Sequence, residues 1–483
     1  MNGTIKAQAA PELCPWLAFQ AGRLYHFGKV APFSIDQQPC PAMMRPRYIE
    51  DVIDLTDPAL NHILNMSVEE ARARVRSGDP KAVRAIEGSF ALVARDGKTV
   101  RLARSMDRPM RYFLAKREDG PALVVAHRIE EIHRWLQSVG FADQFHPNYT
   151  RMVPAHYVVT LELIGCPDPA PAYTRFFEIP TETLPPDLPT IGRYYIGALK
   201  EEIRRWLLSI PEDEPIGVTF SGGIDSGSVF LVTYHTLLEL GMNPGRLKAF
   251  TLDLGDGPDR NQAFTFLQKL GLELFWEPVE AGPELIDIRE VVRLVEDYKP
   301  LDIESAAMHY ALARALRQRY PDWKYLLDGE GGDENLRAYP IEHNPELTVY
   351  SIINNHLLYH EGWGVDKFKH SITYTGGLSR AYTRTFAINR HFGFEGFSPY
   401  TRPNVIEVAE KIPFAELTGY DKEKLYRLKG EVVYHGVRAV TGFEMPVFEK
   451  RRFQHGALPE ARLRELIPPE RQLRRMVEDL FVS

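Results

Sequence analysis

Cysteine is scarce in this chain of 483 residues, which contains only Cys14, Cys40 and Cys166. Their odd number and wide spacing argue against a disulfide framework, and no pair has the spacing of a zinc site. No apolar run approaches the roughly 20 residues of a membrane span, and the first residues lack the pattern of a secretory signal. We therefore expect a cytoplasmic protein with no membrane partner.

The chain also lacks an excess of basic residues. Lysine and arginine together number 58, against 65 aspartate and glutamate residues, which gives a formal net charge of −7. Proteins that bind nucleic acid through many phosphate contacts usually carry a basic excess, so we expect no nucleic-acid partner. The apolar fraction of 44% and the charged fraction of 25% are ordinary for a globular protein. The length exceeds what a single core supports and predicts two or three domains.

The first part of the chain predicts a domain rich in short strands. Strands are expected at 91–97, 99–105, 111–116, 122–127 and 156–164, and helices at 68–86 and 129–139, the first broken near 78–80. This density of strands favours a mostly antiparallel sheet or sandwich. The proline-rich stretch 166–190 cannot form a continuous core element, so we place a domain boundary near residue 185. A surface arm of a single domain is the alternative.

Beyond this boundary, strands and helices alternate. Helices are expected at 191–209, 226–240, 261–270 and 305–319, and strands at 215–220, 247–253, 273–278 and 324–329. Such alternation favours an α/β fold with a doubly wound parallel sheet. Ligands of such sheets lie at the carboxyl ends of the strands. Residues 345–483 are expected to be mostly helical.

The most informative motif is "FSGGIDS", residues 220–226, which lies between an apolar strand and an apolar helix. Backbone N–H groups at the start of a helix favour an anion, and glycines allow it to approach closely. No lysine follows, so this is not the GxxxxGK[ST] loop. Asp225 would repel a phosphate, but it makes sense as a ligand of a Mg²⁺ ion that bridges phosphate oxygens. A glycine turn with a polar cap is the alternative.

Two motifs carry a resemblance to a known superfamily. "FSGGIDS" resembles the pyrophosphate-binding loop of the ATP pyrophosphatase (PP-loop) superfamily, and "LLDGEGGDENLRAY", residues 326–339, resembles the "GEGxDE" segment of asparagine synthetases. The resemblance implies that Asp225 and Asp333 hold Mg²⁺, and that Leu252 lies near the adenine of ATP. A solvated acidic turn is the alternative for the second motif. The implied nucleotide-binding residues are Ser221, Gly222, Gly223, Ile224, Asp225, Ser226, Leu252 and Gly329.

Two further segments bear on catalysis. "HFGFEGFSPY" and "FEKRRFQHG" resemble asparagine synthetase segments that place Glu395 at the active-site glutamate and Lys450 at the catalytic lysine. Glu330 of the "GEG" stretch completes the implied catalytic set. In that chemistry a carboxylate attacks the α-phosphate of ATP, and an amine then attacks the acyl-adenylate. A lysine stabilises the developing charge while a carboxylate accepts the amine proton. A solvated basic surface is the alternative for Lys450.

The resemblance extends into the first domain through "IEGSFALVARDGKTVRLARSMDRPMRYFLA", residues 86–115. In glutamine-dependent asparagine synthetases this domain is an N-terminal-nucleophile (Ntn) glutaminase whose cysteine directly follows the initiator methionine. Here residue 2 is Asn, and the family's "RGPD", "NGEIYN" and "SDTE" segments are not found where they should be. We therefore expect an Ntn-hydrolase-like antiparallel α+β domain at 1–185 without glutaminase activity. Use of Cys14 as the nucleophile after N-terminal processing is the alternative.

The sequence thus predicts a ligase whose ATP pyrophosphatase domain, at 186–483, joins a carboxylic acid to ammonia or an amine with ATP and Mg²⁺. β-Lactam synthetases carry "GYG" where this chain has "GEG", which favours the branch of the family that joins its acid to a separate amine. Phe397, Arg402 and Phe448 depart from the asparagine synthetase pattern, so the acid need not be aspartate. Three alternatives stay open: a glutamine-dependent asparagine synthetase, an intramolecular cyclase of the β-lactam synthetase or peptide cyclase type, and a non-catalytic scaffold. The oligomeric state is also open, with a homodimer as one candidate.

Overall fold

The structure is a computed structural model in which Pro46–Ser483 forms one compact unit. It describes residues 47–49, 51–115, 122–166, 170–255, 257–338, 341, 348–354, 385–448, 456–458 and 460–482. Cys14 and Lys450 therefore lie outside the described residues, and the predictions for them stay predictions. In the part of the chain that is described, no helix combines the length and the hydropathy that a membrane span requires.

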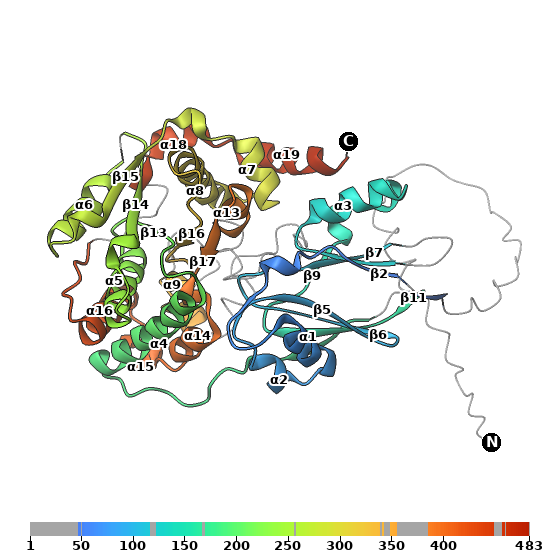
Figure 1. Ribbon diagram of the computed structural model, residues 1–483, viewed down its shortest axis with the longest axis horizontal. Helices are drawn as coiled ribbons and strands as arrows, with labels where there is room; N and C mark the ends of the chain where they lie inside the picture. The colour runs from blue at the N-terminus through green and yellow to red at the C-terminus, as the bar shows by residue number, and fades with distance from the viewer. Residues whose placement is uncertain are drawn as a thin grey trace, which may run out of the picture. The chain divides into compact units, whose positions relative to one another are not determined.

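The first half is built from two four-stranded sheets (Figure 1). One sheet has the order β12-β10-β6-β5, all antiparallel: β5 (Ala91–Asp96), β6 (Thr99–Arg104), β10 (Tyr157–Glu162) and β12 (Ala172–Arg175). The other has the order β2-β8-β7-β9: β2 (Asp51–Asp54), β7 (Arg111–Ala115), β8 (Ala122–Ala126) and β9 (Arg151–Met152). Only β2 and β8 run parallel in it. Two short pairs complete this half: β1 (Arg47–Tyr48) with β11 (Ile164–Cys166), and β3 (His62–Ile63) with β4 (Gly88–Ser89).

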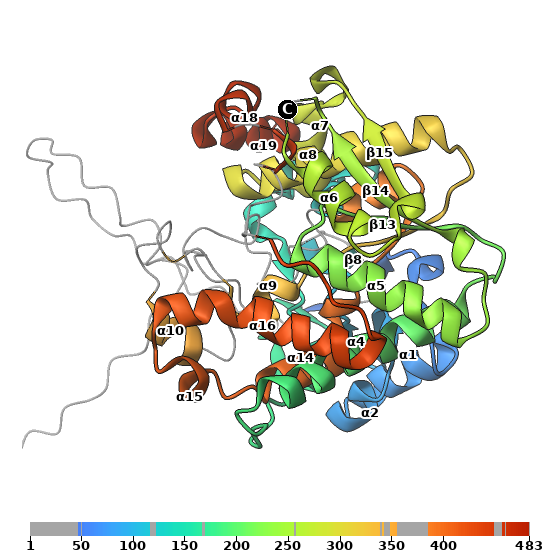
Figure 2. The same ribbon diagram turned by 90° about the vertical axis from the view of Figure 1, so that its left-hand side faces the viewer.

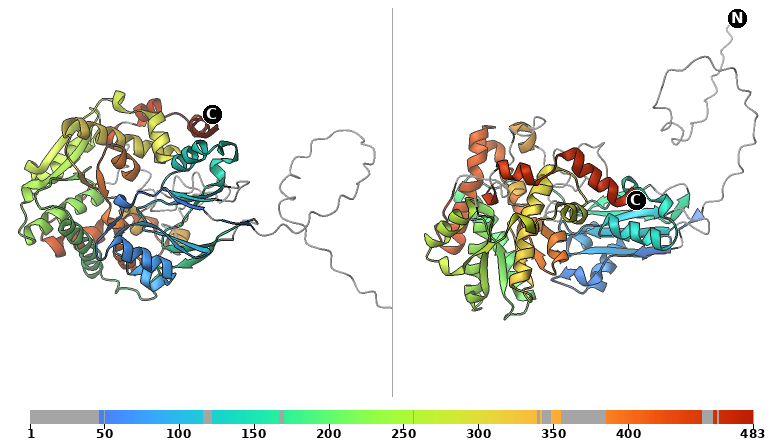
Figure 3. Two further views of the ribbon diagram at one scale, coloured as in Figure 1. Left: turned by 45° about the vertical axis from the view of Figure 1, so that its right-hand side comes forward. Right: turned by 90° about the horizontal axis from the view of Figure 1, so that it is seen from above.

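These two sheets pack face to face because apolar residues alternate along their strands. Leu102 and Val159 of one sheet share a core with Leu123 and Val125 of the other. Helices α1 (Val68–Ser77) and α2 (Pro80–Arg84) cover one outer face, and α3 (Ile129–Ser138) covers the other (Figure 3). The predicted, mostly antiparallel sandwich is confirmed. Its assignment to the Ntn-hydrolase type stays a prediction.

The predicted break within helix 68–86 is also confirmed, and it has a local cause. Helix α1 ends at Gly78, which adopts a φ of 73° that other residues disfavour. The Asp79 side chain then caps α2, and Pro80 occupies the first turn, where its missing N–H costs nothing.

The second half contains a five-stranded parallel sheet with the order β15-β14-β13-β16-β17. Its strands are β13 (Ile216–Thr219), β14 (Leu247–Asp253), β15 (Trp276–Glu280), β16 (Tyr325–Leu327) and β17 (Glu395–Phe397). In chain order this reads 3-2-1-4-5, so the chain winds outward on both sides of β13. The predicted doubly wound sheet is confirmed. Its winding reverses between β13 and β16, where such sheets bind ligands.

Helices cover both faces of this parallel sheet. Helices α4 (Leu188–Ser209), α5 (Ile224–Glu239) and α16 (Lys422–Thr441) pack together on one face, as Figure 2 shows. Helices α7 (Ile288–Val295) and α8 (Pro300–Arg319) share the core of the other face with Phe250 and Leu252. Helix α8 begins before its predicted start because Pro300 is tolerated in a first turn.

The later part of the chain is mostly helical where it is described, as predicted. Besides α16, the described helices of this part are α10 (Val349–Asn354), α13 (Ala387–His391), α14 (Pro403–Glu410), α15 (Phe414–Thr418), α18 (Glu460–Leu466) and α19 (Glu470–Val482). Two further helices lie earlier in the chain: α6 (Asp259–Gln268) follows β14, and α9 (Gly332–Asn335) follows β16. Strand β17 is the exception. Its three residues are too few to give a periodic signal.

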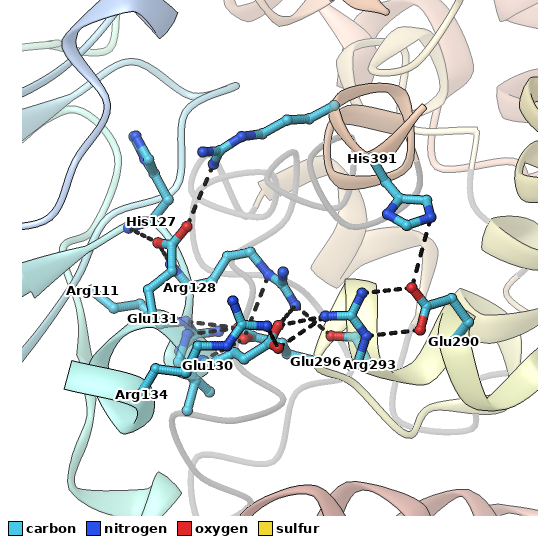
Figure 4. Close-up of polar contacts among 12 residues, drawn as sticks. Arg111, His127, Arg128, Glu130, Glu131, Arg134, Glu290, Arg293, Glu296 and His391 are labelled. Atoms are coloured by element: carbon cyan, nitrogen blue, oxygen red, sulfur yellow. Dashed lines mark hydrogen bonds and ion pairs between the residues drawn. The ribbon is translucent and has the colours of Figure 1, made fainter. Parts of the chain in front are cut away.

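A group of arginines and glutamates joins the two halves (Figure 4). We call it the junction cluster, and it consists of Arg111, Arg128, Glu130, Glu290, Arg293 and Glu296. Arg293 of α7 binds both carboxylate oxygens of Glu130 of α3, at 2.9 and 2.8 Å. The Arg128 guanidinium donates to the Arg293 carbonyl oxygen at 2.6 Å. The two halves are therefore held together by directional, charge-assisted bonds.

Glu296 is the buried centre of the junction cluster, with 2% of its surface exposed. It follows α7 with a φ of 53°, and its carboxylate accepts hydrogen bonds from the backbone nitrogens of Ile129 and Glu130, each at 2.9 Å. The side chain thus caps the first turn of α3 in the other half. Burial raises the pKa of Glu296, while Arg128 and Arg111 oppose that rise. The predicted boundary near residue 185 stays a prediction.

Candidate active site

The 221–226 loop connects β13 to α5 at the carboxyl edge of the parallel sheet. The Ser226 hydroxyl accepts from the Ser221 nitrogen at 3.2 Å, and the Ser221 hydroxyl accepts from the Gly223 nitrogen at 3.3 Å. Gly222 has a φ of 70°, and a Cβ there would lie 2.8 Å from the Ala263 backbone. The loop is therefore a tight turn that requires glycine.

The same loop forms the N-terminus of α5. Gly223 is the N-cap of this helix and makes no side-chain cap hydrogen bond. The backbone N–H groups of a first turn carry partial positive charge and favour an anion. The turn can therefore hold a phosphate group, with the serine hydroxyls beside it.

A second loop, 328–333, leaves the neighbouring strand β16. Because Val218 of β13 pairs with Leu327 of β16, the two loops emerge side by side. A Cβ on Gly329 would lie 2.8 Å from both the Asp225 Cβ and the Ser226 nitrogen, so only glycine permits this approach. Asp333 lies in the first turn of α9. The structure thus brings Asp333 to the loop that carries Asp225.

Lys429 of α16 joins the two loops. Its ammonium lies 2.5 Å from Asp333 Oδ1 and also binds Asp225 Oδ2. Only 3% of Lys429 is exposed. Burial alone would lower the pKa of Lys429, but the two carboxylates outweigh it and hold the pKa above its ordinary value. We call Asp225, Asp333 and Lys429 the site triad.

The sequence analysis missed Lys429, although α16 carries a signal. The helix buries Leu425, Leu428, Val432 and Val433 on one face, and Lys429 lies within that apolar stripe. A lysine is almost never fully buried unless it is paired. Its position therefore indicates a buried acidic partner, but the pattern cannot say which one.

Buried hydroxyl and amide groups pack against the first turn of α5, which carries Asp225. The hydroxyl oxygens of Ser228 and Tyr400 lie 2.6 Å apart, and Ser228 also donates to the Asp225 carbonyl oxygen at 2.8 Å. Asn335 donates to the Tyr400 carbonyl oxygen at 2.9 Å, and the rings of Tyr195 and Tyr400 stack at 5.6 Å. Burial raises the pKa of Tyr400, so its hydroxyl stays neutral. These contacts fix the start of α5.

The structure brings most of the sequence-predicted residues to one place. The 221–226 loop, Gly329, Glu330 and Asp333 all lie at the carboxyl ends of β13 and β16. The Glu330 nitrogen donates to Asp328 Oδ1 at 3.0 Å, and burial raises the pKa of Asp328 to about 6. Leu252 is buried in β14 and packs in the core beside α7 and α8. Its predicted contact with adenine stays a prediction.

Glu395 lies apart from the other sequence-predicted site residues. Glu395 is the first residue of β17, and it pairs in register with Tyr325, the first residue of β16. Because the strands are parallel, Glu395 lies at the amino edge of the sheet, opposite the site triad. Its carboxylate lies 3.0 Å from the Lys324 ammonium, and both side chains are about half exposed. The structure therefore does not bring Glu395 to the candidate active site.

Arg402 forms a buried ion pair with the first half of the chain. Its guanidinium donates to Ser89 at 2.9 Å and to Asp107 at 3.0 Å, both in the first half of the chain. Burial alone would raise the pKa of Asp107, but Arg402 and Arg108 outweigh it and lower the pKa to about 2. Arg402 thus links the two halves.

The two aspartates of the site triad suit a magnesium ion that arrives with phosphate oxygens. The Asp225 and Asp333 carboxylates converge on one point, where the structure has the Lys429 ammonium. The described residues contain no group of three or more histidine, cysteine, aspartate or glutamate side chains suited to a metal. Mg²⁺ usually takes one or two carboxylates and completes its shell with water and phosphate. The donor set therefore suits a metal–nucleotide complex better than a bare metal.

Residues 207–364 match the family model described as asparagine synthase. The matched range contains both loops of the candidate active site, Asp225 and Asp333 included. This match supports an asparagine synthetase-like protein and an enzyme of the ligase class. It does not extend to the first half, to β17 or to Lys429. No curated protein matches the chain.

Proposed function

We propose that the protein is an ATP-dependent ligase that activates a carboxylic acid as an acyl-adenylate, releases pyrophosphate, and transfers the acyl group to ammonia or an amine. One observation carries this proposal. The N-terminus of α5, a place that favours an anion, and two aspartates converge where the winding of a parallel sheet reverses, inside the segment that matches asparagine synthase.

The chain's residues divide this work between binding and proton transfer. The 221–226 loop binds the β- and γ-phosphates through backbone N–H groups and the Ser221 and Ser226 hydroxyls. Asp225 and Asp333 hold Mg²⁺, which neutralises phosphate charge when bound. Glu330 accepts the proton of the attacking amine, since it belongs to the 328–333 loop. Lys450 keeps its predicted role as the lysine that stabilises charge on the α-phosphate.

The first half serves as a structural partner and not as a glutaminase in this proposal. Glu296 and Arg402 bind it to the synthetase half through buried, charge-assisted contacts. Such contacts support a fixed docking arrangement. The acyl acceptor is then free ammonia or an amine substrate.

Hydroxylamine trapping tests the proposal. The full chain is incubated with ATP, Mg²⁺, hydroxylamine and a panel of carboxylic acids, and acyl hydroxamate is measured. We expect hydroxamate with at least one acid, with AMP and pyrophosphate formed in equal amounts. The variant Asp333→Asn should lose this activity. The matched control Asp213→Asn changes an exposed aspartate at the amino edge and should keep it.

Each alternative predicts a different outcome of this experiment. Release of glutamate from added glutamine would favour the alternative of a glutamine-dependent asparagine synthetase. A product formed from one acid alone, with no amine incorporated, would favour the intramolecular cyclase. ATP binding without any pyrophosphate release would favour the scaffold and contradict the proposal.

A further inference from the structure

We propose that Lys429 acts as a place-holding cation. In the nucleotide-free protein its ammonium occupies the position between Asp225 and Asp333 and excludes a free divalent cation, so that the metal enters only together with ATP. This inference rests on the proposed function and adds an order of binding to it.

The first argument is geometric. The Lys429 ammonium contacts one oxygen of each carboxylate, Asp225 Oδ2 and Asp333 Oδ1. These are the oxygens that a shared metal ion would use, because they converge on one point. An ammonium and a metal cannot occupy that point together. A divalent cation must therefore displace Lys429 before it can bind both aspartates.

The second argument is that Lys429 is held firmly in place. Helix α16 packs against α4 so closely that a Cβ on Gly192 would lie 2.5 Å from the Val432 carbonyl oxygen. A Cβ on Gly436 of α16 would lie 2.3 Å from the Gly192 carbonyl oxygen. The two helix backbones are thus nearly in contact. Lys429 emerges from a fixed helix, and 4% of its side chain is exposed.

The third argument is electrostatic. The Asp225 and Asp333 carboxylates repel one another at this distance, and a cation between them removes this repulsion. Displacing the ammonium from that position leaves a buried charge that must find a new partner. Because Lys429 is only 3% exposed, its displaced ammonium finds little solvation in place of the two carboxylates, and a free metal ion must offset this loss. The nucleotide-free site therefore disfavours a bare divalent cation.

ATP changes this balance because it supplies a new anion. A phosphate on the 221–226 loop lies beside Asp225, which is the second residue of α5. Phosphate oxygens can accept from the ammonium and can also complete the metal's ligand shell. The metal and the nucleotide thus each remove the obstacle to the other, which is positive coupling between two ligands.

Manganese binding to the full chain tests the inference by electron paramagnetic resonance, which detects free Mn²⁺ and needs no turnover. We expect the wild-type protein without nucleotide to leave added Mn²⁺ free, and, once a non-hydrolysable ATP analogue is present, to bind more Mn²⁺ than the analogue alone does. The variant Lys429→Met should gain a nucleotide-independent Mn²⁺ site, with affinity raised about 100-fold. Adding Asp333→Asn to that variant should remove the gained site.

Two control variants keep the result specific. Lys424→Met changes an exposed lysine on the same helix and should leave Mn²⁺ binding as in the wild type. Lys429→Arg keeps the cation and should keep the exclusion. Circular dichroism establishes that each variant is folded.

Tight binding of Mn²⁺ to the nucleotide-free wild type would overturn the inference, and this outcome does not depend on the folding of any variant. A folded Lys429→Met protein that gains no site would also overturn it. Failure of the ligase proposal would look different, because the Mn²⁺ results would stand while no acid supported pyrophosphate release.

Discussion

The junction cluster and the site triad are both groups of charged side chains with a buried member at the centre, Glu296 in the first and Lys429 in the second, but they are built differently. In the junction cluster, three arginines form ion pairs with three glutamates, Arg293 hydrogen-bonds both Glu130 and Glu290, and Glu296 caps a helix. In the site triad, two carboxylates on separate glycine-rich loops converge on one ammonium. The first arrangement is complete within the protein. The second brings like charges together at a helix N-terminus, as binding and catalytic sites often do.

The comparison teaches that burial alone does not mark a functional charge. Both groups have a buried central residue, and the pKa of that residue is raised in both. What distinguishes the site triad is its location at the carboxyl edge of the parallel sheet, where the winding reverses. Changes in the junction cluster should therefore affect stability, whereas changes in the site triad should affect ligand binding and turnover.

The largest expected effect comes from Asp333→Ala. Loss of a carboxylate that holds the metal should lower kcat/KM for acyl-adenylate formation by about 1,000-fold. The free energy of unfolding should change far less, because Asp333 is partly exposed and lies on a loop. Steady-state kinetics and urea denaturation of the same preparation measure the two effects. If Asp333→Ala instead lowered the free energy of unfolding enough to account for the lost activity, the site triad would be a structural group like the junction cluster.

Glu296→Ala should have the opposite profile. Removing this carboxylate takes a buried negative charge away from Arg128 and Arg111 and uncaps α3, which should lower the free energy of unfolding by about 3 kcal/mol. The activity of the remaining folded protein should stay close to that of the wild type. Urea denaturation and initial rates at low temperature test this. The exposed Glu423→Ala on α16 serves as the control and should change neither quantity.

Acid should weaken the ion pair between Arg402 and Asp107, which is the second link between the two halves. The folded pKa of Asp107 is lowered to about 2 from its ordinary value of 3.8. A lowered pKa in the folded state gives stability that is present above pH 4 and lost as the pH falls toward 2. The contribution is about 2 kcal/mol. The free energy of unfolding, measured between pH 4 and pH 2, should fall by this amount in the wild type. In the variant Asp107→Asn it should depend less on pH. A variant with the same pH dependence as the wild type would contradict this assignment.

Tyr400→Phe should give the smallest effect. The change removes the hydroxyl group that lies 2.6 Å from Ser228, while Ser228 keeps its bond to the Asp225 carbonyl oxygen. One neutral hydrogen bond contributes about 1 kcal/mol, so both stability and kcat/KM should fall only slightly. A loss of activity as large as that of Asp333→Ala would show that the hydroxyl itself takes part in the reaction.

Much of the fold could be predicted because its signals are local. Strand 247–253 is observed with its predicted bounds, and the loop 220–226 lies between a strand and a helix as expected. Apolar runs of the right length and glycine turns specify such elements without tertiary information. The placement of Asp333 beside Asp225 also follows from topology, because both loops leave adjacent strands.

The remainder depended on contacts between distant segments. Lys429 lies 204 positions after Asp225 in the chain, and no local pattern connects them. Glu395 belongs to a strand of three residues, so similarity to a motif could not show at which end of the sheet it lies. Arg402 binds Asp107, which lies 295 positions earlier in the chain, so no local pattern could show this contact. Each of these positions is decided by packing and not by neighbouring residues.

Exchange of labelled pyrophosphate into ATP tests the central claim most directly, because it detects reversible acyl-adenylate formation before any amine is needed. The full chain, with Mg²⁺, should catalyse an exchange that depends on a carboxylic acid and that Asp333→Ala abolishes. Exchange that persists in Asp333→Ala, or its absence with every acid in a protein that binds ATP, would contradict the account.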